Sequence, residues 1–147
     1  MVSLTKIFSE FVYNAKPNDF NDEMKFFSKM SMLDWAGVAY AGRKEPVSNI
    51  VTKLIEDDKS HGNSRIISNG VSVNSKSAAL VNGTIGHALD YDDTHFLFTG
   101  HPTASAFPTA LAIGEELNSS IDEIILAYMC GVEVSTRLGH ILGYSHY

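Results

Sequence analysis

The 147-residue sequence lacks several features that define whole classes of protein. Its one cysteine, Cys130, cannot form an internal disulfide, which favours a reducing compartment, and we expect a cytoplasmic protein with this thiol buried. The apolar run around Cys130 ends at Glu133, well short of the roughly 20 residues that span a membrane. Only 11 Lys and Arg stand against 17 Asp and Glu, with no basic stripe for nucleic acid. We therefore predict a soluble domain that binds neither membrane nor nucleic acid.

Common motifs for nucleotide, metal and serine chemistry are missing too. The chain has no GxxxxGK[ST], GxGxxG or GxSxG, and no HExxH or CxxC. An EF-hand that began at Asp90 would have His95 in place of Gly and His101 in place of Glu. No spacing supports a metal, so we predict no metal. The alternative is a zinc or iron site from some of these ligands: Asp92, Asp93, His95 and His101.

What the sequence does contain is helical periodicity. Apolar residues recur at helical spacing, and Asn, Ser and Pro stand where helices begin, at Asn74 or Ser75, Pro102 and Ser120. The run "MSMLDWAGVAYAG" is apolar nearly all round, which predicts a central, buried helix with Asp34 hydrogen-bonded inside it. Pro108 predicts a kink or a late start in its helix. The predicted helices cover residues 4–12, from a start near 19–22 to 42, 46–55, 74–89, from 102 onward, and 120–142.

One segment departs from this period. In "SRIISNGVSV" two β-branched runs flank Asn69-Gly70, a pair typical of a type I′ turn. We predict a small β-hairpin near residues 64–73. The fold class is then mainly α, in one domain that covers residues 1–147.

The stretch "HALDYDDTHFLFTGHP", residues 87–102, gathers three Asp and three His between two predicted helices. The N-terminus of the second helix offers free N–H groups for a substrate carboxylate, and His101 stands there as a possible general acid. Asp92 and Asp93 are expected to be mainly structural. The alternative is that all these groups only form caps and Asx turns.

Longer stretches carry a family resemblance. "VNGTIGHALDYDDTH", "GHPTASAFPTALAIGEE" and "ILAYMCGVEVSTRLG", with the earlier "LDWAGVAYAG", resemble the MmgE/PrpD family, which includes 2-methylcitrate dehydratase and cis-aconitate decarboxylase. The resemblance implies a homodimer without metal or organic cofactor, built of a large helical domain and a smaller α+β lid domain. It also implies that Asp90, Thr94 and His101 line the active site.

By the same resemblance, residues 1–147 are the N-terminal part of the helical domain. His146-Tyr147 resembles the "HY" that precedes a segment with a further active-site His, and a Lys and a Tyr of the site would also lie beyond this chain. We expect a fragment of a cofactor-independent lyase for small di- or tricarboxylates. The alternatives are a non-catalytic helical piece that associates with a partner segment, and a dicarboxylate epimerase of the same family.

Overall fold

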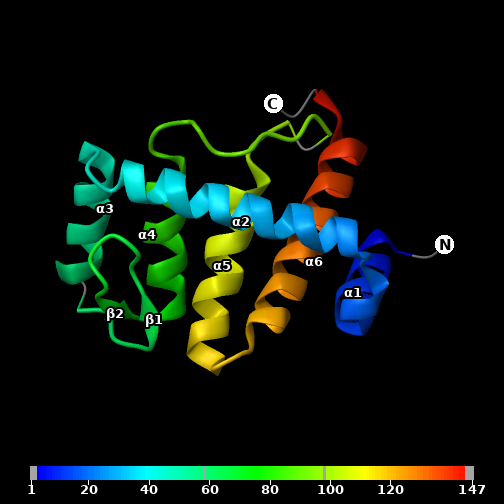
Figure 1. Ribbon diagram of the computed structural model, residues 1–147, viewed down its shortest axis with the longest axis horizontal. Helices are drawn as coiled ribbons and strands as arrows, with labels where there is room; N and C mark the ends of the chain where they lie inside the picture. Colours follow the sequence, from blue (N-terminus) through cyan, green and yellow to red (C-terminus); the bar gives the residue numbers. More distant parts are fainter. Residues whose placement is uncertain (1–2, 58, 98, 145–147) are drawn as a thin grey trace.

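The computed structural model describes residues 3–57, 59–97 and 99–144, and within them the fold is mainly α (Figure 1). This confirms the predicted class. Helices α4, α5 and α6 lie side by side, and the long helix α2 crosses all three (Figure 1). The elements are α1 (Leu4–Asn14), η1 (Pro17–Asp19), α2 (Asp22–Gly42), α3 (Pro46–Asp57), β1 (Ser64–Arg65), β2 (Ser72–Val73), α4 (Ser75–His87), α5 (Pro102–Leu117) and α6 (Ile121–Leu142).

The helices begin where local signals place them. The side chain of Asn74 accepts the Ser77 N–H at 2.9 Å and so starts α4. Ser120 and Glu123 form the predicted capping box of α6, in which the carboxylate accepts the Ser120 N–H at 2.7 Å. Pro102 is the first residue of α5, where its missing N–H costs nothing. Some ends differ: α4 stops at His87 and not at Leu89, whereas α1 and α3 each run two residues farther than predicted, to Asn14 and Asp57.

Aromatic contacts between the crossing helix and the layer below it form the core. Trp35 of α2 is 1% exposed, and its ring meets Phe107 of α5 edge-on with centroids 5.0 Å apart. Phe107 in turn meets Tyr128 of α6 at 5.7 Å. Gly86 of α4 permits this close packing, because a Cβ there would lie 2.2 Å from Trp35 Nε1. The core thus fixes the ends of α4 and α5 that carry the candidate site.

Helix α2 corrects one expectation. It is buried only on the face that carries Trp35, Ala39 and Gly42, whereas Leu33 is 67% exposed. The reason is that α2 crosses one side of the α4–α6 layer, so no described element covers its other face. Asp34 lies on that outer face, where its exposed side chain makes no hydrogen bond to a described residue, so the predicted buried bond is wrong.

The hairpin is present, but its turn differs from the prediction. Ser64 pairs with Val73 and Arg65 with Ser72, so residues 66–71 form the connection. A type I′ turn needs positive φ at both central residues, and here Gly70 has φ +74° while Asn69 does not share it. Asn69 instead accepts the Val71 N–H with its side chain at 3.0 Å, which stabilises a wider turn.

Pro108 neither delays nor divides α5, which is continuous from Pro102 to Leu117. A proline has no N–H to donate to the carbonyl four residues earlier, that of Ala104. This oxygen faces Gly83 of α4, where a Cβ would approach it to 3.0 Å. The predicted late start is therefore wrong. Among the described helices, none is long and apolar enough to cross a lipid bilayer.

Candidate active site

The connection between α4 and α5, residues 88–101, folds back so that its last residue lies beside the end of α4. Asp90 adopts a left-handed conformation with φ +55°, and its N–H donates to the His87 carbonyl at 3.1 Å. Farther along, the His95 N–H donates to the Gly100 carbonyl at 3.0 Å. This local folding places His101, at the start of α5, beside His87, at the end of α4, with ring centroids 4.6 Å apart.

Four ionisable side chains meet there: His87, Asp90, Asp92 and His101, named below the histidine–aspartate cluster. The side chain of Asp92 is fully buried, and its Oδ1 lies 2.9 Å from His87 Nδ1. Its Oδ2 lies 3.4 Å from His101 Nδ1. On the other edge of the His101 ring, Nε2 lies 3.3 Å from Asp90 Oδ1, and the Asp90 side chain is 76% exposed. A buried carboxylate thus holds both imidazoles, and an exposed one faces outward.

The backbone determines which nitrogen of His101 can do chemistry. His101 Nδ1 lies 3.1 Å from the carbonyl oxygen of Asp92, and only an N–H can bond to a carbonyl. In the neutral ring, this assignment leaves Nε2 as the unprotonated nitrogen. That nitrogen faces Asp90, so the two groups that can exchange protons with a ligand are adjacent.

Asp93 has a different task, as expected for a structural residue. Its carboxylate accepts the Thr103 N–H at 3.2 Å and the Thr103 hydroxyl at 2.6 Å. Thr103 Oγ1 also lies 2.6 Å from the hydroxyl of Tyr128, whose pKa is raised chiefly by burial. One part of the sequence interpretation is corrected here. Pro102 has no N–H and Asp93 takes that of Thr103, so these two positions offer a substrate carboxylate no free donor.

A groove of about 550 Å³ runs beside the histidine–aspartate cluster, between α4 and α5 with α3 at its edge. Both imidazoles form part of its wall. Gly83 lets α4 and α5 approach closely beside the groove, since a Cβ there would lie 3.0 Å from the Ala104 carbonyl oxygen. The full lining is Val47, Gly83, Thr84, His87, Ala88, His101, Ala104 and Ser105.

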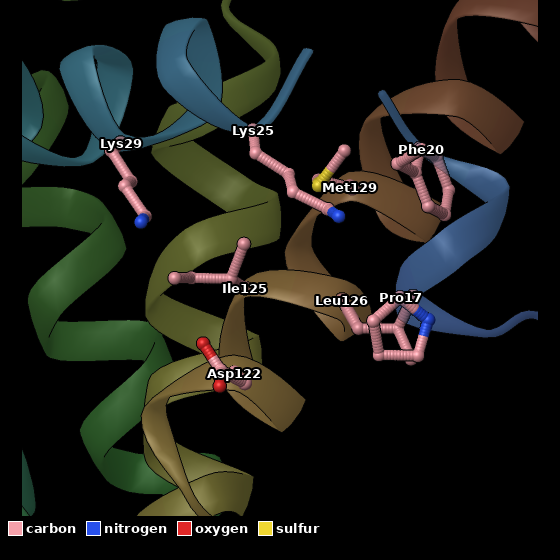
Figure 2. Close-up of a pocket in the computed structure, with 8 residues that line it drawn as sticks. All are labelled: Pro17, Phe20, Lys25, Lys29, Asp122, Ile125, Leu126 and Met129. Carbon is pink, nitrogen blue, oxygen red and sulfur yellow. The ribbon is translucent and has the colours of Figure 1, made fainter. Parts of the chain in front are cut away.

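A second, smaller cavity of about 140 Å³ lies between η1, the start of α2 and α6. Figure 2 shows Lys25 and Lys29 of α2 on one side of it and Asp122 of α6 on the other, with Ile125 between them and Phe20 to the right beside Met129. It shares no residue with the groove and has no histidine. The groove at the α4–α5 connection therefore suits acid–base chemistry better than this cavity does.

Comparison with known proteins decides the family, because the family model for the MmgE/PrpD N-terminal domain matches residues 6–147. The chain belongs to the MmgE/PrpD family. It is 31% identical over 144 residues to cis-aconitate decarboxylase of Mus musculus, covering 94% of this chain and 29% of that protein. For cis-aconitate decarboxylase of Homo sapiens the identity is 29% over 143 residues, with 94% and 30% covered.

A more distant relative is the cis-aconitate decarboxylase-like protein oryM of Aspergillus oryzae, which is 24% identical over 145 residues and of which this chain covers 30%. The chain spans about 30% of the length of the curated relatives it matches. The MmgE/PrpD resemblance inferred from the motifs is confirmed. The interpretation of His146-Tyr147 lies outside the described residues.

Of the three residues that the MmgE/PrpD resemblance assigns to the site, the structure brings two together. Asp90 and His101 are in contact at 3.3 Å. Thr94 is exposed and makes no hydrogen bond to a described residue, so it does not join that contact. The assignment of all three to catalysis stays a prediction.

Sequence reasoning missed His87, which binds Asp92 and lines the groove. The sequence offered only a weak signal for His87, its place in the last turn of a predicted helix within the stretch that gathers Asp and His. The alternative zinc set inferred from the sequence does not form as such, since Asp93 is bonded to Thr103. Within the described residues, the set that converges contains His87 and Asp90 instead of Asp93 and His95.

Proposed function

We propose that this chain supplies the Asp90–His101 part of the active site of a lyase for small di- or tricarboxylates, of 2-methylcitrate dehydratase or cis-aconitate decarboxylase type. The observation that carries the proposal is the 3.3 Å contact of His101 Nε2 with Asp90 Oδ1 beside the groove. Membership of the MmgE/PrpD family and the names of the relatives support it. Because the chain spans about 30% of those relatives, the activity of the whole protein is part of the proposal.

In a dehydration, one group removes a proton from the carbon next to a carboxylate, and another protonates the departing hydroxyl. Asp90 suits the first role, because its carboxylate is exposed. His101 suits the second through Nε2, whose orientation the bond from Nδ1 to the Asp92 carbonyl fixes. In a decarboxylation, the bond between a substrate carbon and its carboxylate breaks, carbon dioxide leaves, and the electron pair stays on that carbon. Protonated His101 then donates a proton to the same carbon, which completes the product.

The surroundings reduce the repulsion that three neighbouring acids would exert on an anionic substrate. Asp92 is buried against His87 and His101, and Asp93 is bonded to Thr103. Asp90 is then the one acid of the three with a largely exposed carboxylate. When protonated, the two imidazoles on the groove wall add positive charge close to a bound carboxylate.

A second candidate is a non-catalytic helical piece that acts by association with a partner segment. The exposed apolar face of α2 favours it, since Phe26 is 58%, Phe27 59% and Leu33 67% exposed. We also propose that the full-length form is a cytoplasmic homodimer that works without metal or organic cofactor.

The test uses a chimera in which this chain replaces the matched part of the mouse relative. Asp90→Asn and His101→Ala should each lower turnover of cis-aconitate or 2-methylcitrate about 100-fold or more, the usual contribution of a positioned acid or base. His61→Ala, at an exposed histidine away from the groove, is the matched control and should leave turnover unchanged.

The isolated chain gives a second measurement, which does not depend on a working chimera. Adding cis-aconitate should shift the imidazole C–H resonances of His87 and His101 and leave that of His61 in place. Full turnover in both chimera variants would contradict the assignment. Unshifted cluster resonances together with an inactive chimera would favour the second candidate.

A further inference from the structure

The histidine–aspartate cluster has a composition that the proposed proton transfers do not require. Its four residues each bring one nitrogen or oxygen atom to within 4.8 Å of the others. The two histidines are anchored in helices, His87 as the last residue of α4 and His101 at the cap of α5, while both acids belong to the connection. Potential ligands from three places in the chain therefore converge without any rearrangement of the fold.

The charges in this cluster are not balanced by a permanent cation. Within the described residues, the ion-pair contacts of Asp90 and Asp92 are to His87 and His101 alone, and neither acid meets Lys or Arg. The Asp92 side chain is fully buried. A buried carboxylate is costly unless it is paired or coordinates a metal. A divalent cation would balance the charge of these acids.

The orientation of His101 is the one that metal-binding histidines adopt. Such a histidine usually donates its second ring N–H to a carboxylate or a backbone carbonyl, which fixes the tautomer and aims the other nitrogen at the metal. His101 directs Nδ1 to the Asp92 carbonyl at 3.1 Å and presents Nε2 toward Asp90. The supporting bond of a metal ligand is already in place.

Distances and donor types indicate which ion fits. In a tetrahedral zinc site with bonds of about 2.0–2.1 Å, neighbouring ligand atoms are about 3.4 Å apart. His87 Nδ1 lies 2.9 Å from Asp92 Oδ1, and His101 Nε2 lies 3.3 Å from Asp90 Oδ1. Two imidazoles with two carboxylates favour zinc and similar transition metals over magnesium or calcium, which prefer oxygen ligands alone.

We propose that the histidine–aspartate cluster binds one Zn²⁺ ion, with Asp90 as its most exposed ligand. This goes beyond the proposed function, which uses no metal. The bound ion takes Nε2 of His101 and the carboxylate of Asp90, so these groups can no longer transfer protons. The ion is therefore an inhibitor of the proposed lyase, and this last step rests on the proposed function.

The test is calorimetric titration of the full chain with ZnCl₂ in a buffer without chelators or carboxylates. One Zn²⁺ per chain is expected, and both His87→Gln and Asp90→Asn should weaken binding by about tenfold or more. Asp90→Asn is the decisive variant, because its 76% exposed side chain is not part of the core and its loss cannot unfold the chain. His61→Gln is the matched control at an exposed histidine and should bind as the parent does. Far-UV circular dichroism checks the fold of each variant.

Three results would overturn the inference: no saturable binding, equal affinity in the parent and Asp90→Asn, or Mg²⁺ binding as tight as that of Zn²⁺. Its failure is distinguishable from failure of the proposed function, because turnover is assayed with a chelator present. Zinc binding without turnover supports this inference and contradicts the lyase. Turnover in the presence of chelator, together with no zinc binding, would support the lyase and contradict this inference.

Discussion

Helix α5 is joined to its neighbours by two connections whose polar side chains have different roles. Residues 118–120 lead to α6. Ser120 forms a capping box with Glu123, and the Ser119 N–H donates to the Gly114 carbonyl at 2.8 Å. Residues 88–101 come from α4, and only Asp93 among their acids caps the helix. Asp90 and Asp92 contact histidines instead. A connection whose polar groups exceed what its helices need is where function is to be sought.

The largest effect is expected at Asp93, the residue of the longer connection that caps the helix. Asp93→Ala removes the acceptor of the Thr103 N–H and of the buried Thr103 hydroxyl. We expect the free energy of unfolding to fall by about 2–3 kcal/mol, measured by urea denaturation. Asp93→Asn retains one acceptor oxygen and should lose less. A loss below about 0.5 kcal/mol for Asp93→Ala would mean that Asp93 is not a cap, and the comparison would fail.

Tyr128 extends the Asp93–Thr103 bond into α6, and its removal should have the next largest effect. Tyr128→Phe should cost about 1.5 kcal/mol at neutral pH, because Thr103 loses a buried hydrogen-bond partner. Burial raises the Tyr128 pKa above its ordinary value of 10.0, so the folded state holds the phenol proton more tightly than the unfolded state does. This contribution is present below pH 10 and lost as the pH rises through the folded pKa.

The measurement for Tyr128 is urea denaturation of both proteins from pH 9 to pH 11. The parent should lose stability with rising pH more steeply than Tyr128→Phe, since the variant lacks the titrating group. Parallel curves would show that the phenol proton does not stabilise the fold.

Ser120 belongs to the shorter connection, and Ser120→Ala should cost about 1 kcal/mol through loss of the cap. Hydrogen bonds from the Ser120 N–H and hydroxyl lower the Glu123 pKa below its ordinary value of 4.5. A lowered pKa stabilises the fold above 4.5, and this contribution is lost as the pH falls through the folded value. The gap between parent and Ser120→Ala should therefore narrow between pH 7 and pH 3 in thermal denaturation. A gap that widens toward acid would contradict the sign.

The two connections were not equally predictable from sequence. Ser120 and Asn74 act on residues within one turn of themselves, so a local pattern was enough to place the starts of α6 and α4. The pairing of His87 with Asp92 depends on how a whole connection folds back, which no local spacing encodes. Likewise, which face of α2 is buried depends on the helices it crosses, and its nearly uniform apolar pattern gave no orientation.

The Asp90–His101 contact had another source. Charge and helix-end arguments selected the segment and His101, but the assignment of Asp90 came from the family resemblance, which also named Thr94. The structure adds a reason for the first pair and none for Thr94. Asp93 shows the limit of helix-end reasoning, because the α5 terminus that suits an anion already holds a carboxylate of its own chain.

Substitution of the left-handed residues is expected to change stability least, yet it distinguishes the two connections most clearly by their response to ligands. Each contains a residue other than glycine in the left-handed region, Asn118 with φ 54° and Asp90 with φ 55°. Glycine adopts this region at no steric cost, so Asn118→Gly and Asp90→Gly should each raise stability slightly, by about 0.5 kcal/mol or less, in urea denaturation. Only Asp90→Gly should also abolish the response of His101 to cis-aconitate and weaken the binding of Zn²⁺. If Asp90→Gly instead lowers stability by about 1 kcal/mol or more, the contact with His101 stabilises the fold, and Asp90 would resemble the capping residues of the shorter connection.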